Sequence, residues 1–203
     1  MRFLKHIFPN KQVKDDIIVV SGLPRSGTSM LMGMLEAGGV EILTDLVREA
    51  DEDNPKGYFE FEPVKQLAED RSKSWLEDAP GKAVKVISEL LKELPSDFSF
   101  RLIFVNRHLE EVIASQNKML VRRGEPPDGG DDEKMMLLFE RHLGKVNQWI
   151  DRQSHFEVIF LDYQKVLEDP TGQAEKIKAF LQRELDVTKM ARVVDRELYR
   201  NRS

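Results

Sequence analysis

Residues 21–30, with the sequence SGLPRSGTSM, constrain the fold of this chain more than any other segment. They follow the apolar run of residues 17–20, which predicts a short buried strand, and they precede a helix that we expect to start near Ser26. A strand that turns through glycines into a helix leaves several backbone N–H groups pointing at one place, at the positive end of the helix dipole. The segment therefore predicts an anion site, most naturally for a phosphate.

The spacing of the two glycines, Gly22-x4-Gly27, is that of a phosphate-binding loop. In the ATP-binding form of this loop a lysine follows the second glycine, whereas this chain has Thr28 there. The cation is Arg25 instead, inside the loop. The loop therefore predicts a phosphate held by an arginine.

Composition limits the class of protein. A chain of 203 residues with 40% hydrophobic content predicts one domain, over residues 1–203, with a full core. The net charge of -5 argues against a nucleic-acid binder, so a polyanionic ligand has to be held by local cations. The absence of cysteine excludes disulfides and thiolate metal sites. No apolar run reaches membrane-spanning length, and residues 1–10 are too short and too charged for a secretory signal, so we expect a cytoplasmic protein.

Strand and helix patterns alternate along the rest of the chain. Residues 84–87, 102–105 and 158–161 are short apolar runs typical of strands that are covered on both faces. Helical stripes lie over residues 109–120 and 174–181, and a longer one consists of Met135, Leu138, Phe139, His142, Val146, Trp149 and Ile150. The alternation predicts an α/β fold, a P-loop-type three-layer sandwich with a short parallel sheet flanked by helices.

Two segments interrupt this pattern. Residues 44–80 mix charged residues, Asn54-Pro55, Gly57 and aromatic residues, and we expect an inserted excursion there. Residues 122–132, with the sequence RRGEPPDGGDD, have the composition of a loop.

Two further blocks carry polar residues at strand ends. Arg107 follows the predicted strand 102–105, and Ser115 comes eight residues later on the predicted helix. The third block runs from Asp162-Tyr163 through a short helix to Asp169-Pro170 and then to Phe180-Leu181. Together with the segment Pro24–Ser29, these blocks resemble, in order and spacing, the sulfotransferases that use 3′-phosphoadenosine 5′-phosphosulfate (PAPS). The arginine in the loop resembles the tyrosylprotein branch and many bacterial members.

The resemblance implies the activity and the donor site. It implies transfer of a sulfuryl group from PAPS to a hydroxyl or amine of an unknown acceptor, with no metal. The 5′-phosphosulfate would be held by Pro24, Arg25, Ser26, Gly27, Thr28 and Ser29, and the 3′-phosphate by Arg107 and Ser115. The excursions at 44–80 and 122–132 would lie on the acceptor side.

The positions of Arg107 and Ser115 predict an anion site independently of the family resemblance. Arg107 comes where a strand ends and a helix begins, the place where α/β sheets bind ligands. Ser115 lies two helical turns further on, so both residues can contact one phosphate that rests on the first two turns. The alternatives are a surface cation at Arg107 and a small packing residue at Ser115.

Two cations are candidates for the chemistry. Arg25 is the first, because sulfuryl transfer moves charge onto the leaving phosphate and fixed cations stabilise that charge. Lys85 is the second, since a lysine in an apolar strand is costly to bury unless it meets an anion. An edge strand that turns Lys85 to water is the alternative.

The general base is the least determined assignment. In the cytosolic branch of the family a catalytic histidine follows a lysine on the corresponding strand, but no histidine follows Lys85 here. The alternation in residues 57–62 predicts an extended segment with Glu60 and Glu62 on one face and Phe59 and Phe61 on the other. Glu60 is the first choice for the base and Glu62 the second, and a polar surface over a phenylalanine anchor is the alternative.

Two other functions compete with sulfuryl transfer. A P-loop kinase or NTPase is suggested by the apolar run 158–161 ending in Asp162 and by Ser29, which would contact Mg²⁺. The missing lysine argues against it. A non-catalytic nucleotide-binding domain of the same fold is the second alternative.

Some residues depart from the patterns of metal sites and of the cytosolic branch. The four histidines, His6, His108, His142 and His155, form no pattern of metal ligands. Met30 stands where many cytosolic members have a tryptophan, and their C-terminal Arg-Lys-Gly segment is missing, with only the arginines after Asp195 to replace it.

Overall fold

The sheet has four parallel strands in the order β2-β1-β3-β4. The computed structural model describes residues 16–45, 57–125 and 132–195. The strands are β1 (Ile17–Gly22), β2 (Ala83–Lys85), β3 (Phe100–Asn106) and β4 (Phe156–Asp162). All four strands were expected from their apolar runs, but β2 ends at Lys85, so Ile87 lies beyond it.

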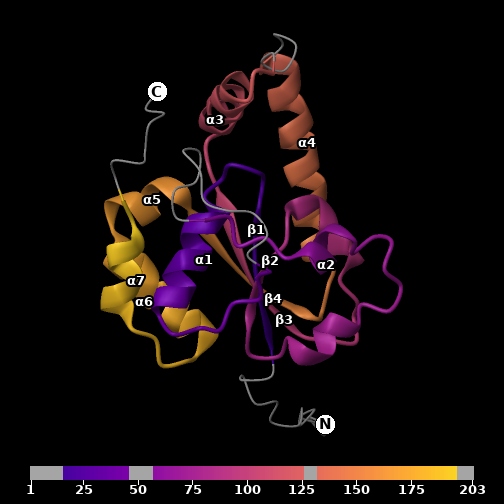
Figure 1. Ribbon diagram of the computed structural model, residues 1–203, viewed down its shortest axis with the longest axis vertical. Coiled ribbons are helices and arrows are strands. Elements are labelled where there is room, and N and C mark those ends of the chain that lie inside the picture. Colours follow the sequence, from indigo (N-terminus) through magenta and orange to yellow (C-terminus); the bar gives the residue numbers. More distant parts are fainter. Residues whose placement is uncertain (1–15, 46–56, 126–131, 196–203) are drawn as a thin grey trace, which may run out of the picture.

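Helices cover both faces of the sheet, as Figure 1 shows. One face packs against α1 (Thr28–Ala37), α5 (Tyr163–Glu168), α6 (Pro170–Leu181) and α7 (Val187–Val193). The other packs against α2 (Glu62–Lys65), α4 (Asp132–Ile150) and the 3₁₀ helices η2 (Ser74–Asp78) and η3 (Ser88–Glu93). The expected three-layer α/β sandwich is therefore confirmed.

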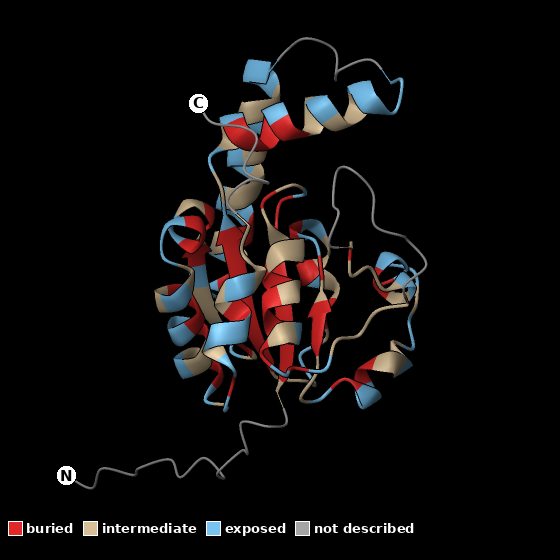
Figure 2. Cartoon of the chain, turned by 60° about the vertical axis from the view of Figure 1, so that its left-hand side comes forward, coloured by how far each residue is buried: buried red, intermediate tan, exposed pale blue. Residues whose placement is uncertain are grey.

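The period of two along each strand divides the core into two clusters. In β1, Ile18 and Val20 enter the cluster under α1, whereas Ile17 and Val19 enter the cluster under α4. Every residue of β1 is buried, because the strand is covered on both faces and on both sides. Figure 2 shows this buried centre, with exposed residues on the outer faces of the helices.

The strand order places a topological switch between β1 and β3. The chain leaves β1 toward β2 on one side, and it leaves β3 toward β4 on the other. Ligands of open α/β sheets bind outside the carboxyl ends of the strands at such a point. Arg25 follows β1 and Arg107 follows β3, so both cations come from this point.

The helices α3 (Leu109–Arg122) and α4 form a hairpin beyond the carboxyl edge of the sheet (Figures 1 and 2). The buried residues of α3 lie between Glu111 and Ser115, and those of α4 are Val146 and Ile150. The predicted stripe of α4 is therefore core only in its second half: Leu138 is 51% exposed. No helix in the described part of the chain is long and apolar enough to cross a membrane.

The two predicted excursions are only partly described. Of residues 122–132, Arg122 ends α3 and Asp132 begins α4, so these two are helical rather than loop, and 126–131 lie outside the described residues. Of residues 44–80, 46–56 lie outside, and the remainder contains α2 and η2. The termini, with His6 and the arginines after Asp195, also lie outside.

Candidate active site

The loop after β1 is closed by two glycines in close contact with their surroundings. Gly22 has φ 154°, and a Cβ there would lie 2.6 Å from Ser26 Oγ and 2.7 Å from the Val105 carbonyl oxygen. Gly27 has φ 104°, and a Cβ there would lie 2.4 Å from the Tyr163 ring. Larger residues would push the loop away from β3 and from Tyr163.

The loop ends at a helix start that no side chain caps. Helix α1 begins at Thr28, two residues later than expected, so Ser26 and Gly27 belong to the loop. Gly27 is the N-cap and makes no side-chain hydrogen bond. Ser26 is 1% exposed, and its hydroxyl has no hydrogen-bond partner among the described residues. An uncapped helix N-terminus with an orphaned buried hydroxyl beside it fits an anion such as a phosphate.

Arg25 connects this loop to α3. Its backbone has φ 69°, in the left-handed region, and its Nε donates to Ser115 Oγ at 3.1 Å. Arg107 Nη1 donates to the carbonyl oxygen of Arg25 at 3.0 Å. The structure thus brings Arg25, Arg107 and Ser115 together, although they come from three places in the chain.

The Arg107 guanidinium contacts two side chains, Glu111 and Tyr163, to which the sequence analysis gave no role in the site. Its Nε donates to Glu111 Oε2 at 2.8 Å, and both side chains are buried. Its guanidinium lies 4.4 Å from the centroid of the Tyr163 ring. Burial raises the pKa of the Tyr163 hydroxyl, and the nearby Arg107 charge opposes that shift. Glu111 could have been found from its i+4 spacing to Arg107, and Tyr163 from its place in the third block.

Lys85 points toward the start of α1 from the edge strand β2. Its Nζ donates to the Tyr58 carbonyl oxygen and lies 3.5 Å from Ser29 Oγ. Ser29 Oγ in turn donates to the same carbonyl oxygen at 3.4 Å. The strand is an edge strand, as the alternative supposed, yet the half-buried lysine turns inward to the loop rather than to water.

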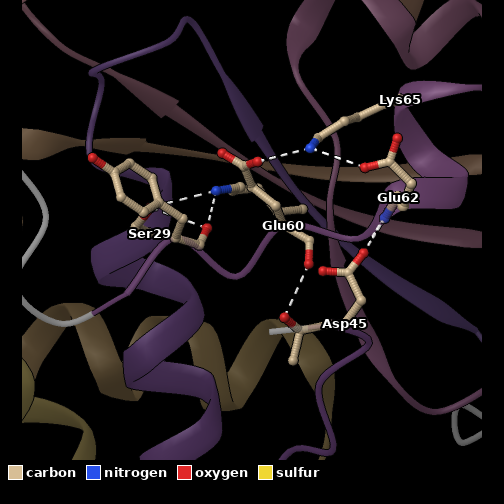
Figure 3. Close-up of polar contacts among 8 residues, drawn as sticks. Ser29, Asp45, Glu60, Glu62 and Lys65 are labelled. Carbon is tan, nitrogen blue, oxygen red and sulfur yellow. Dashed lines mark hydrogen bonds and ion pairs between the residues drawn. The ribbon is translucent and has the colours of Figure 1, made fainter. Parts of the chain in front are cut away.

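Glu60 and Glu62 share one cation (Figure 3). Lys65 Nζ lies 3.1 Å from Glu60 Oε2 and 3.0 Å from Glu62 Oε2. Its bonds to these two carboxylates raise the pKa of the Lys65 ammonium. The Glu60 side chain is 21% exposed and that of Glu62 is 50% exposed, so Glu60 has the drier environment.

The expected extended alternation of residues 57–62 is wrong. Phe59 has φ 50°, which breaks the alternation, and Glu62 already begins α2. Phe59 packs against the cluster under α1, whereas Phe61 packs against the cluster under α4. The two phenylalanines therefore anchor the segment on opposite faces of the sheet.

Hydrogen bonds hold this segment against residues 44–45. The Glu60 carbonyl oxygen accepts from Thr44 Oγ1 at 2.9 Å and from the Asp45 amide at 3.2 Å. The Glu62 amide donates to Asp45 Oδ2 at 2.5 Å (Figure 3). These three bonds fix the backbone from the Glu60 carbonyl group to the Glu62 amide.

Asp162 caps a helix. Its Oδ1 accepts from the Lys165 amide at 3.0 Å, at the N-terminus of α5. This position explains the aspartate after the apolar run without a metal. In residues 16–45, 57–125 and 132–195 no three His, Asp or Glu side chains are grouped so as to hold a metal ion.

A cavity of about 330 Å³ adjoins Arg107 on the side of β4. Its walls come from the ends of β3 and β4, the start of α3 and the first half of α4. The residues that line it are Asn106, Arg107, His108, Leu109, Glu110, Met136, Glu140 and Asp162. The cavity therefore has an apolar part and three carboxylates, and the Arg107 guanidinium and the His108 ring also line it.

Comparisons with known proteins agree with this geometry. The family described as sulfotransferase domain matches residues 14–202. No curated protein matches the chain by sequence. The structure resembles that of sulfotransferase STF1 from Mycobacterium tuberculosis H37Rv, with 16% identity, 89% of this chain and 70% of that chain covered, and a TM-score of 0.56.

Two sulfotransferase domains of biosynthetic proteins are similar in the same way. The domain from the Synechococcus PCC 7002 olefin synthase has 16% identity, covers 93% of this chain and 83% of its own, and gives a TM-score of 0.53. The domain from the curacin biosynthetic pathway has 13% identity, covers 89% and 78%, and gives a TM-score of 0.53. These likenesses show the fold.

The family match covers almost the whole chain, so the chain belongs to the sulfotransferase family. It is a transferase, and its family normally takes the sulfuryl group from PAPS. The kinase or NTPase alternative is not favoured.

The capping role of Asp162 can be tested by stability. Asp162→Ala should lower the free energy of unfolding by about 0.5–2 kcal/mol, because the first turn of α5 loses its acceptor. Asp162→Asn, whose amide oxygen still accepts, should stay close to the wild type in urea unfolding. An equal loss in both variants would show that the charge rather than the cap is needed.

Proposed function

We propose that this protein transfers a sulfuryl group from PAPS to a hydroxyl or amine of an acceptor. The observation that carries the proposal is the connection of Arg25, Ser115 and Arg107 at the switch point between β1 and β3. A donor with two separated phosphates needs two anion sites. The loop at residues 22–29 supplies one, and the start of α3 with Arg107 and Ser115 supplies the other.

The residues present fit such a donor. The uncapped N-terminus of α1 and the orphaned Ser26 hydroxyl suit the 5′-phosphosulfate, with Pro24, Gly27, Thr28 and Ser29 completing the loop. At the other site, Glu111 and the carbonyl oxygen of Arg25 hold the Arg107 guanidinium, which keeps its orientation fixed. The donor supplies the sulfuryl group, whose bond to a phosphate oxygen breaks as a bond to the acceptor forms.

Arg25 and Lys85 stabilise the developing charge in this proposal. The Arg25 backbone is held by Arg107 and its side chain by Ser115, so the guanidinium is fixed beside the phosphate loop. Lys85 approaches the same loop from β2, at Ser29. Cations that are already in place need no reorganisation when charge moves onto the leaving phosphate.

Glu60 accepts the acceptor's proton. Its carboxylate lies on a segment that also contacts Lys85 through the Tyr58 carbonyl oxygen, so base and cation are close in the fold. The Lys65 ammonium lies 3.1 Å from the Glu60 carboxylate and holds it in place on this segment. Glu62 shares this cation but is more exposed, so it is the second choice.

The donor site predicts a preference for the 3′-phosphate. The protein should bind 3′-phosphoadenosine 5′-phosphate far better than adenosine 5′-phosphate. Glu111→Gln should keep most of this preference. The double variant Arg107→Ala/Glu111→Gln should lose about 10- to 150-fold of it, since a charge-assisted bond contributes about 1.5–3 kcal/mol.

Titration calorimetry of both nucleotides with both variants measures this preference. The single variant is the matched control, because the double variant then leaves no charged carboxylate buried without its arginine. Equal affinity of the wild type for the two nucleotides would contradict the donor assignment.

The role of Arg25 predicts a loss of turnover. Arg25→Ala should lower kcat by about 10²–10³ or more, in proportion to the loss of one donor to developing charge. Affinity for 3′-phosphoadenosine 5′-phosphate should fall much less. Arg25→Lys, which keeps a charge, should recover part of kcat. If kcat and product affinity fall together, Arg25 serves binding alone.

The assignment of Glu60 as the general base predicts a change in the pH–rate profile of its variant. Glu60→Gln should keep donor binding, remove most turnover and abolish the acidic limb, where protonation of the base stops the reaction. Glu62→Gln is the matched control and should have little effect. EDTA should leave wild-type activity intact. Activity kept in Glu60→Gln and lost in Glu62→Gln would move the role to Glu62, and strict dependence on Mg²⁺ would support the NTPase alternative.

A further inference from the structure

Phe59 has a backbone conformation that a bulky residue rarely adopts. Its φ of 50° lies in the left-handed region, which is disfavoured for residues with a large side chain. Such a conformation costs free energy and persists only where the surrounding structure holds it, most often beside a functional site. The turn at Phe59 therefore depends on the contacts that this residue makes with the rest of the fold.

The Phe59 ring holds the turn by packing against α1. The ring is partly buried against the cluster under α1. On the facing side of the helix, a Cβ at Gly33 would lie 3.8 Å from the ring and 3.2 Å from Val193 Cγ1 of α7. Glycine inside a helix is destabilising and usually marks a close approach of a neighbour. The ring thus rests on α1 at a point where the helix has no side chain of its own.

The turn lies between two groups of the candidate site. Before Phe59, the Tyr58 carbonyl oxygen accepts from Lys85 Nζ. The same oxygen accepts from Ser29 Oγ at 3.4 Å, at the start of α1. After Phe59 comes Glu60, whose carboxylate contacts are drawn in Figure 3. Because the torsion at Phe59 lies between the Tyr58 carbonyl group and Glu60, it sets how these two groups are oriented toward each other.

We propose that Phe59 is a positioning residue for the transfer reaction. Its ring, seated on α1, holds the turn that fixes Lys85 and Glu60 relative to each other and to the phosphate loop. This inference rests on the proposed function, in which Lys85 stabilises charge and Glu60 accepts a proton. Phe59 acts through these neighbours and not on the reacting atoms. A misplacement of about 1 Å can lower a rate about 10²-fold, so an anchor that sets two such groups has a large effect on turnover.

The first experiment measures acetylation of Lys85 by acetic anhydride in the full chain without nucleotide, followed by mass spectrometry. In Phe59→Ala, Lys85 should react about tenfold faster or more, because its ammonium loses a hydrogen bond. Phe59→Gly should behave likewise, since glycine adopts the turn freely but supplies no ring. Lys82, which pairs with Glu41 at 2.7 Å, is the reference lysine in each sample. Phe98→Ala removes a partly buried phenylalanine from the other cluster and is the matched control, with an unchanged rate.

The second experiment measures the release of 3′-phosphoadenosine 5′-phosphate from PAPS, with phenol as the probe acceptor. Phe59→Ala should lower this rate about 10- to 100-fold, because Lys85 and Glu60 are displaced. Its affinity for 3′-phosphoadenosine 5′-phosphate should stay close to that of the wild type. In the Lys85→Met background the same change should cost less, since one of the groups that Phe59 positions is already gone. Phe59→Leu keeps an apolar side chain on α1, so it should fall between alanine and the wild type in both experiments.

Three results would overturn the inference. They are an unchanged acetylation rate of Lys85 in Phe59→Ala and Phe59→Leu, wild-type behaviour of Phe59→Gly, and an equal gain for Lys85 and Lys82, which would indicate a general loosening of the fold. The proposed function is judged separately. Wild-type turnover in Lys85→Met would remove Lys85 from the chemistry, even where Phe59→Ala has released it. Low turnover in Lys85→Met with wild-type turnover in Phe59→Ala would overturn this inference alone.

Discussion

The parallel pairing of β1 with β3 is the constraint on which the site depends. Residues Ile17 to Gly22 pair in register with Phe100 to Val105, so the loop after β1 and the turn after β3 start at the same level. Arg107 can therefore donate to the backbone of Arg25, and Ser115 can accept from its side chain. A shift of one residue in this register would turn every side chain of β1 to the opposite cluster and would separate the two arginines.

The layers could be predicted from the sequence because buried parallel strands are continuous apolar runs and the helices between them are amphipathic. The hairpin shows where this argument stops. The stripe from Met135 to Ile150 has helical period along its whole length, but only its second half meets the sheet. Periodicity identifies a face of a helix, whereas the neighbouring elements decide whether that face is covered. Leu138 is exposed for this reason.

The candidate site, too, could be predicted only in part from the sequence. The loop could be predicted because glycine spacing and a strand-to-helix turn are local properties of the backbone. The contacts of Lys65 with Glu60 and Glu62 could not be predicted, because they depend on the turn at Phe59. There a left-handed φ sends Phe59 and Phe61 to opposite clusters of the core. Alternation alone gave an extended segment, since nothing local indicates that the anchors belong to different faces. Likewise, the packing of Tyr163 on Arg107 depends on β3 and β4 being neighbours.

The contact of Gly27 with the Tyr163 ring has a consequence for how the protein folds. The phosphate loop rests on a side chain that enters only after β4, so residues from the first and last strands must both be in place before the loop has its final shape. Contacts between such distant parts of a chain form late, because the intervening segments must be closed first. During synthesis, the nascent chain acquires its anion site only once the last strand and the start of α5 have left the ribosome.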